Sequence, residues 1–150
     1  MLGLCFEETM KGQWHRVDSP GVERAIEFHA RGEVSRLREL LGDTVAKLSG
    51  RVVVDGLTRG TDFEGTLGLG ALLREKRLPY AFAFRADDGR RYRFDGAKEV
   101  SVRELARTMT TLPAYIYDDS GSEIGRAVLH FDLRGDLVTF LRSWKPFRTR

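Results

Sequence analysis

Hydrophobic and polar residues alternate along most of this chain, and a period of two is the pattern of a half-buried β-strand. Ile26 and Phe28, for example, fall on one side of a strand that places Glu27 and His29 on the other. Similar runs predict eight strands, at residues 4–14, 24–30, 51–57, 63–73, 80–86, 91–94, 114–117 and 124–133. We expect Phe131 to be buried, because it shares the phase of its aliphatic neighbours.

Turn residues separate the predicted strands. Aspartate and glycine mark tight hairpins at 87–89 and 118–121, and a Pro-Gly pair marks a turn at 18–21. Residues 58–62 are polar, contain a glycine and are predicted to form a loop.

Hydrophobic residues switch to helical spacing in two places, which predicts short helices near 34–41 and 136–144. Gly32 is expected to end the strand before the first of these helices. A helical turn is also predicted within 101–109.

Two segments share one order of residue types. Residues 26–34 and 129–137 both carry an alternating run and then arginine, glycine, an acid and an aliphatic residue. An amphipathic run follows each. The similarity indicates either an internal duplication or a chance likeness between two strand–glycine–helix junctions.

Successive hairpins favour an antiparallel sheet. The predicted fold is therefore mainly β, with about eight antiparallel strands and two short helices. A closed barrel and a two-layer sandwich both suit this number of strands. The 150 residues fit a single domain, 1–150, that is large enough to bury its own core.

Composition narrows the class of protein further. Cys5 is the single cysteine, so an internal disulfide is excluded, and we expect it to be a small buried residue in the first strand. No apolar run has the length of a membrane span, and no signal peptide is recognised, so a cytoplasmic protein is expected. Neither a metal nor a cofactor is predicted.

The net charge is +3, and the end of the sequence is basic and aromatic. The residues expected to make weak contact with a membrane surface are Arg142, Trp144, Lys145 and Phe147. A solvated, frayed terminus is the alternative. Nucleic acid is not an expected partner.

Several familiar chemistries are not supported. The glycines at 65, 68 and 70 lack the spacing of a dinucleotide-binding turn, and no Walker lysine follows them. His15, His29 and His130 lack zinc-ligand spacing, and the last two are expected to be exposed. The aspartate pairs at 87–88 and 118–119 suit turn formation better than calcium binding. No serine-hydrolase elbow is present, and no catalytic residue is assigned.

The interior of a barrel offers another kind of site. Aromatic residues on the strands either fill a core or line a pocket for one apolar ligand. The predicted ligand-binding residues are Phe82, Phe84, Tyr92, Phe94, Lys98 and Tyr115. Gly96 leaves room beside Lys98, whose ammonium would meet a ligand oxygen or carboxylate; a solvated residue at a strand end is the alternative. Glu8 and Asp132 are candidate acid–base residues inside a barrel.

One resemblance covers most of the chain. The opening Phe-Glu-Glu-Thr-Met-Lys-Gly at 6–12 resembles the first motif of a β-rich bacterial domain. Further similar segments follow in order, at residues 48–52, 63–67, 80–84, 88–92, 95–98, 110–112, 125–131 and 135–137. That domain is found beside GMC-type flavin oxidoreductases, the class of cholesterol oxidase-like enzymes, and beside lipase-like hydrolases.

The resemblance implies an accessory module that accompanies enzymes of sterol or lipid metabolism. It carries no catalytic residue over to this sequence. The 150 residues contain no flavin-binding segment, so oxidoreductase activity is not implied either. The main hypothesis is a non-enzymatic module that binds an apolar lipid- or sterol-like ligand, or docks on an oxidoreductase or hydrolase that handles one. The alternatives are a small lipid- or steroid-converting enzyme that uses buried carboxylates, and a peripheral membrane protein.

Overall fold

The computed structural model describes residues 2–34, 45–131 and 145–148. Its elements in chain order are β1 (Leu2–Arg16), β2 (Arg24–Val34), β3 (Val45–Val54), β4 (Thr58–Gly68), α1 (Gly70–Glu75), β5 (Arg77–Arg85), β6 (Arg91–Glu99), α2 (Leu105–Thr110), β7 (Thr111–Asp118), β8 (Glu123–His130) and β9 (Lys145–Arg148). Strand dominates, as the alternating sequence predicts.

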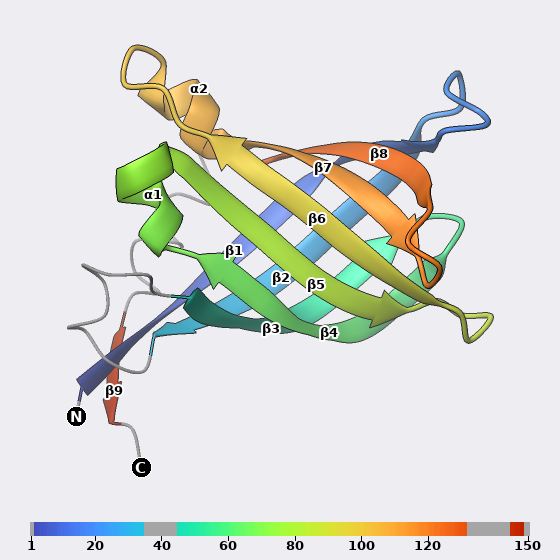
Figure 1. Ribbon diagram of the computed structural model, residues 1–150. Helices are drawn as coiled ribbons and strands as arrows, with labels where there is room; N and C mark the ends of the chain where they lie inside the picture. The colour runs from blue at the N-terminus through green and yellow to red at the C-terminus, as the bar shows by residue number, and fades with distance from the viewer. Residues whose placement is uncertain (1, 35–44, 132–144, 149–150) are drawn as a thin grey trace.

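The first eight strands form a closed antiparallel barrel (Figure 1). Each strand pairs with the next along the chain from β2 to β8. The long strand β1 closes the ring, because it pairs with β2 over Leu4–Trp14 and with β8 over Lys11–Arg16. β9 pairs with the beginning of β1, outside the ring of eight. The barrel, rather than the two-layer sandwich, is therefore the fold.

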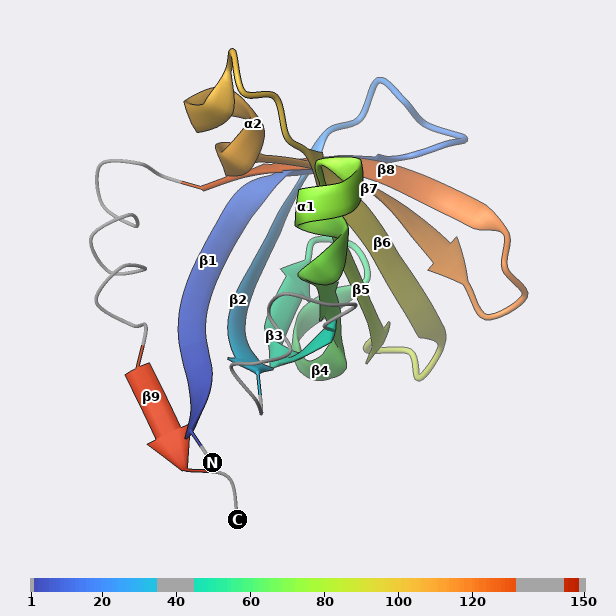
Figure 2. The ribbon, with the colours of Figure 1, turned by 60° about the vertical axis from the view of Figure 1, so that its left-hand side comes forward.

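The two ends of the barrel differ (Figures 1 and 2). The connections β1–β2, β3–β4, β5–β6 and β7–β8 lie at one end, here called the hairpin end. The helices α1 and α2 lie at the other, here called the helix end, because they connect β4 to β5 and β6 to β7. Gly89 and Gly121 both adopt a φ of +87° in hairpin turns, a backbone conformation that other residues rarely adopt.

Along each barrel strand, every second side chain points into the barrel. In β1 the inward residues Phe6, Glu8, Met10 and Trp14 are all buried. Phe131 is buried, as predicted, and so is Cys5, whose thiol donates a hydrogen bond to the Lys145 carbonyl. His29 and His130 point outward and are exposed, as predicted from their phase.

Several predicted strand boundaries were wrong; β3, for example, spans Val45–Val54 rather than 51–57. β2 continues through Gly32 to Val34, because the missing side chain at Gly32 leaves room for the Phe6 ring, which would lie 2.3 Å from an added Cβ. Residues 58–62 belong to β4 rather than to a loop. β4 ends at Gly68, and α1 takes the residues that were predicted to continue the strand.

Of the predicted helices, the turn within 101–109 corresponds to α2. For the helix predicted at 34–41, Val34 closes β2 and residues 35–41 lie outside the described residues. The helix predicted at 136–144 also lies outside them. Of the two similar segments, residues 26–34 lie in β2, whereas residues 129–137 supply only the last two residues of β8, and 132–137 lie outside the described residues.

Candidate functional site

The interior near the hairpin end is filled by aromatic rings. Phe82 lies at the centre, with its ring centroid 4.0 Å from that of Phe63 and 4.6 Å from that of Phe94 in stacked pairs. Phe28 meets Phe82 edge-on at 5.5 Å. Offset-stacked and edge-to-face arrangements are the favourable geometries of aromatic pairs. This half of the barrel is a packed core.

The predicted ligand-binding residues fall into three places. Phe82, Phe84, Tyr92 and Phe94 are buried together in or beside this aromatic core. Tyr115 lies on the outer face of β7, is 44% exposed and has the Arg126 guanidinium 5.6 Å from its ring centroid. The structure therefore does not bring Tyr115 together with the other five.

Lys98 has a separate position inside the barrel. It is only 4% exposed, so the alternative of a solvated strand-end residue was wrong. Its ammonium donates a hydrogen bond of 2.7 Å to Glu8 Oε1. The Tyr80 hydroxyl donates one of 2.8 Å to Glu8 Oε2. Glu8, Tyr80 and Lys98 form what we call the interior polar cluster.

The cluster links opposite walls of the barrel. Tyr80 and Lys98 come from the neighbouring strands β5 and β6, where Tyr80 pairs with Gly96 and Leu78 pairs with Lys98. Glu8 comes from β1, which is four strands away from β5 in either direction around the ring. Its carboxylate therefore reaches across the interior, and closure of the barrel creates the site.

Hydrogen bonding in the cluster is unequal. Both carboxylate oxygens of Glu8 are occupied, one by Lys98 and one by Tyr80. An ammonium has three N–H donors. Lys98 uses one, and the other two have no hydrogen-bond acceptor among the residues that the structure describes. The Lys98 nitrogen also lies 5.2 Å from the centroid of the Tyr80 ring.

The surroundings of Tyr80 in this cluster strongly raise the pKa of its hydroxyl. Burial raises the pKa of Tyr80 well above its usual value, and the nearby negative charge and hydrogen bond of Glu8 raise it further. A tyrosinate beside a carboxylate in an apolar interior is unfavourable, so the Tyr80 hydroxyl keeps its proton and remains a hydrogen-bond donor.

This shift predicts a loss of stability at high pH. Above about pH 10 tyrosine ionises in the unfolded chain, whereas the raised pKa keeps Tyr80 protonated in the folded protein. The unfolded state then binds fewer protons, so Tyr80 contributes a fall of about 1.4 kcal/mol in the free energy of unfolding per pH unit. Its stabilising effect is complete below pH 10. Urea unfolding from pH 9 to 11 should show a steeper fall in wild type than in Tyr80→Phe; equal slopes would contradict the assignment.

Sequence reasoning found part of this cluster. Glu8 was a candidate acid–base residue for a barrel interior, and its phase with Phe6 and Met10 is the signal that places it there. Its predicted companion Asp132 lies outside the described residues. Tyr80 was recognised only as a strand aromatic. The signal that was missed is a tyrosine at an inward-facing position of one strand, opposite a glycine on the next strand.

The aspartates at the hairpin end form turns. Asp118 Oδ1 accepts hydrogen bonds from the Ser120 amide, the Ser120 hydroxyl and the Ser122 amide. These bonds lower the pKa of Asp118. Asp87 accepts hydrogen bonds from the Thr58 hydroxyl and from the Arg59 amide, and these bonds connect the β3–β4 and β5–β6 hairpins.

In the described part of the chain no group of His, Cys, Asp and Glu side chains is arranged to hold a metal ion.

The predicted membrane-contact residues are only partly described. Lys145 is exposed in β9, and Phe147 belongs to the same strand. Arg142 and Trp144 lie outside the described residues. Within the described ranges, no helix has the length and apolar character needed to cross a membrane.

Comparisons with known proteins leave the family open. No protein-family model matches the chain, and no curated protein or solved structure matches it either. A fold of this kind serves many functions, so function has to be argued from the chemistry of the site.

Proposed function

We propose that this protein is a binding module that holds one apolar, lipid- or sterol-like ligand in its barrel, with the polar end of the ligand at the interior polar cluster. The observation that carries this proposal is the buried ammonium of Lys98, which has two donors without an acceptor among the described residues. Small eight-stranded barrels are either filled by side chains or hold one small ligand.

A purely structural role explains the cluster poorly. Removing two charges from water costs several kcal/mol per ion, and apolar side chains of similar size often stabilise a core equally well. Buried ionisable groups with specific partners are also frequent at functional sites. The remainder of the interior shows that this barrel packs apolar residues readily, as at Phe82 and Phe94.

The arrangement of the barrel favours entry from the helix end. Rings fill the interior at the hairpin end, and Trp14 is fixed there by a hydrogen bond from its indole to the Asp55 carbonyl. At the helix end, Val102 before α2, Leu105 at the start of α2 and Val45 at the start of β3 are exposed. Exposed apolar residues at this end suit the approach of an apolar ligand.

The charges of the interior polar cluster determine which polar group of a ligand it favours. Glu8 already neutralises Lys98, so a ligand carboxylate would leave an uncompensated negative charge in the interior. A hydroxyl, ketone or ester oxygen accepts a hydrogen bond without adding charge. We therefore favour a neutral oxygen over the carboxylate that the sequence alone also allowed.

The cluster suits binding better than acid–base catalysis. A general base must accept a proton from its substrate. Both oxygens of Glu8 already accept hydrogen bonds, so proton transfer would require one of these partners to leave. The resemblance to a domain beside flavin oxidoreductases and lipase-like hydrolases supports the same proposal, with the ligand being one that such a partner enzyme handles.

The proposal predicts saturable binding of about one ligand per chain. Native mass spectrometry of purified protein should reveal a co-purified lipid, and an environment-sensitive apolar dye should be displaced by a hydroxylated sterol or its ketone. Lys98→Met should weaken the neutral ligand by about tenfold, because it loses a hydrogen bond to a charged donor. Lys47→Met removes an exposed lysine from the outside of β3 and should change nothing.

Binding must be compared under conditions in which circular dichroism shows each variant to be folded. Failure of sterols, their ketones, esters and fatty acids to bind saturably would contradict the ligand site. Docking on a lipid-handling enzyme would then be the better proposal.

A further inference from the structure

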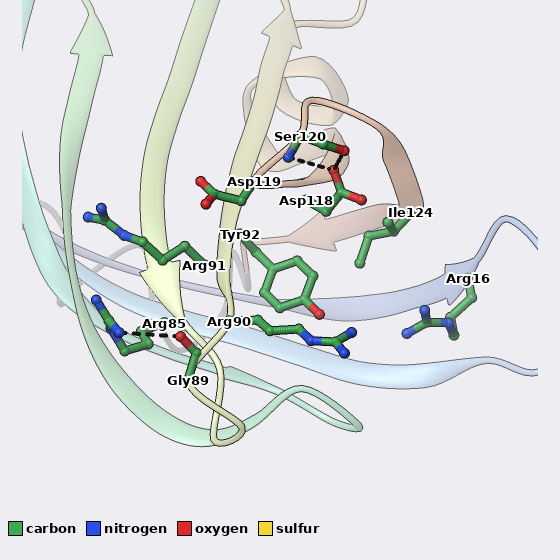
Figure 3. Close-up of a pocket in the computed structure, with 10 residues that line it drawn as sticks. All are labelled: Arg16, Arg85, Gly89, Arg90, Arg91, Tyr92, Asp118, Asp119, Ser120 and Ile124. Atoms are coloured by element: carbon green, nitrogen blue, oxygen red, sulfur yellow. Dashed lines mark hydrogen bonds between the residues drawn. The ribbon is translucent and has the colours of Figure 1, made fainter.

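The hairpin end carries a second, chemically different feature. A cleft of about 480 Å³ opens there between the β5–β6 and β7–β8 hairpins and the end of β1 (Figure 3). We call it the hairpin-end cleft. Its lining residues are Arg16, Arg85, Gly89, Arg90, Arg91, Tyr92, Asp118, Asp119, Ser120 and Ile124. Four guanidinium groups and two carboxylates give this lining a net charge of +2.

A buried phenol lies in this cleft. Tyr92 is only 7% exposed, and its ring stacks on Phe84 at a centroid distance of 5.8 Å. The ring is therefore held by the core. Its hydroxyl points to the side of the cleft where Arg90 and Arg16 lie (Figure 3). That hydroxyl has no hydrogen-bond partner among the described residues, so its donor is available to a ligand in the cleft.

The arginines are poorly compensated. Arg85 and Arg91 stand directly opposite each other on β5 and β6, where like charges destabilise a sheet. Neither has a carboxylate partner within the described ranges; Arg85 donates only to the Gly89 carbonyl. Arg16 and Arg90 make loose, exposed ion pairs of 3.6 Å with Asp18 and Asp88. Such pairs stabilise little.

The two carboxylates of the lining do not neutralise the arginines of the cleft. Asp118 is engaged by the Ser120 and Ser122 donors of its own turn. The Asp119 carboxylate points in a direction different from that of Asp118, and no ion pair joins it to an arginine of the cleft in the described structure (Figure 3). On the side of the cleft to which the Tyr92 hydroxyl points, that phenol and the guanidinium groups of Arg90 and Arg16 can donate to a ligand that accepts hydrogen bonds, whereas Arg91 and Arg85 point to the other side (Figure 3).

We propose that the hairpin-end cleft binds a phosphate group. A phosphate supplies several acceptor oxygens and up to two negative charges, which match the net charge of the lining. The guanidinium groups of Arg90 and Arg16, on the side to which the Tyr92 hydroxyl points, would bind it through paired hydrogen bonds, and that hydroxyl adds a donor (Figure 3). The site lies at the opposite end of β6 from Lys98, so it is independent of the interior ligand.

Inorganic phosphate is the probe for this site, titrated at constant ionic strength and followed by amide NMR shifts. Saturable shifts at residues 90–92 and 118–120 are expected. Tyr92→Phe keeps the ring and removes only the hydroxyl, and it should weaken binding by about threefold to tenfold. Arg90→Gln should weaken it by a similar factor. Arg103→Gln removes an exposed arginine near α2, at the helix end, and should leave binding unchanged.

Vesicles distinguish the source of the phosphate. Flotation with phosphatidylcholine alone is compared with flotation after addition of phosphatidic acid, whose headgroup is a phosphomonoester. Binding of free phosphate without vesicle binding supports a soluble phosphorylated ligand. Vesicle binding that requires phosphatidic acid and is lost in Tyr92→Phe supports a lipid headgroup. Absence of both, or equal weakening by Tyr92→Phe and Arg103→Gln, overturns the proposal.

Discussion

Lys98→Met is expected to lower the free energy of unfolding by about 3–5 kcal/mol. The substitution keeps much of the side-chain volume but removes the ammonium that lies 2.7 Å from Glu8. The Glu8 carboxylate, only 4% exposed, is then left in an apolar interior with the Tyr80 hydroxyl as its remaining described partner. Removing one member of a buried ion pair costs far more than the pair contributes. Urea unfolding measured at neutral pH gives this change directly.

The double variant Glu8→Gln with Lys98→Met is the matched control. It removes both charges together, so no unpaired ion is left behind, and most of the lost stability should return. Tyr80 keeps an acceptor in the glutamine side chain. A loss below about 1 kcal/mol in the single variant would show that Glu8 is not held as a buried charge, and would contradict the role given to this cluster.

Phe82→Ala is expected to cost about 3–5 kcal/mol of stability. Its ring contacts four others, with centroid distances between 4.0 Å for Phe63 and 6.2 Å for Phe84. Truncation removes the centre of this stack and leaves a cavity that rings fixed on four strands cannot fill. Tyr115→Ala, on the outer face of β7, should cost only about 0.5 kcal/mol.

This pair of variants also tests the role of the aromatic core. A small loss of stability in Phe82→Ala, together with a change in dye binding, would assign the rings to a ligand pocket. A large loss without a change in dye binding would leave them as core. Differential scanning calorimetry and dye titration on the same samples separate these outcomes.

Local pattern was a good guide to the strands. Alternation at Ile26 and Phe28 and the turn signals at 87–89 and 118–121 place strands and hairpins where the structure has them. Burial of one face imposes a period of two, and a tight turn requires particular residues, so both leave a local signature. Phe131 was predicted to be buried on the same grounds, and it is.

Strand ends were harder to predict, because their causes are not local. Gly32 looks like a terminator in sequence, yet it extends β2 by admitting the ring of Phe6 from the neighbouring strand. The polar residues 58–62 are strand because β3 pairs with them. Such partners are not visible within a window of a few residues.

The sequence by itself determined the approximate positions of the first eight strands, their antiparallel hairpins and the choice between inward and outward faces, since each depends on neighbouring residues. Only the tertiary structure decided between barrel and sandwich, because closure depends on β1 pairing with β8, more than a hundred residues away. The same closure brings Glu8 to Lys98 across the interior. It also gathers Arg16 with Arg91 and Tyr92 at the hairpin end. Both candidate sites join residues distant in sequence, and the hydrogen bonds that close the barrel, rather than any motif, place them together.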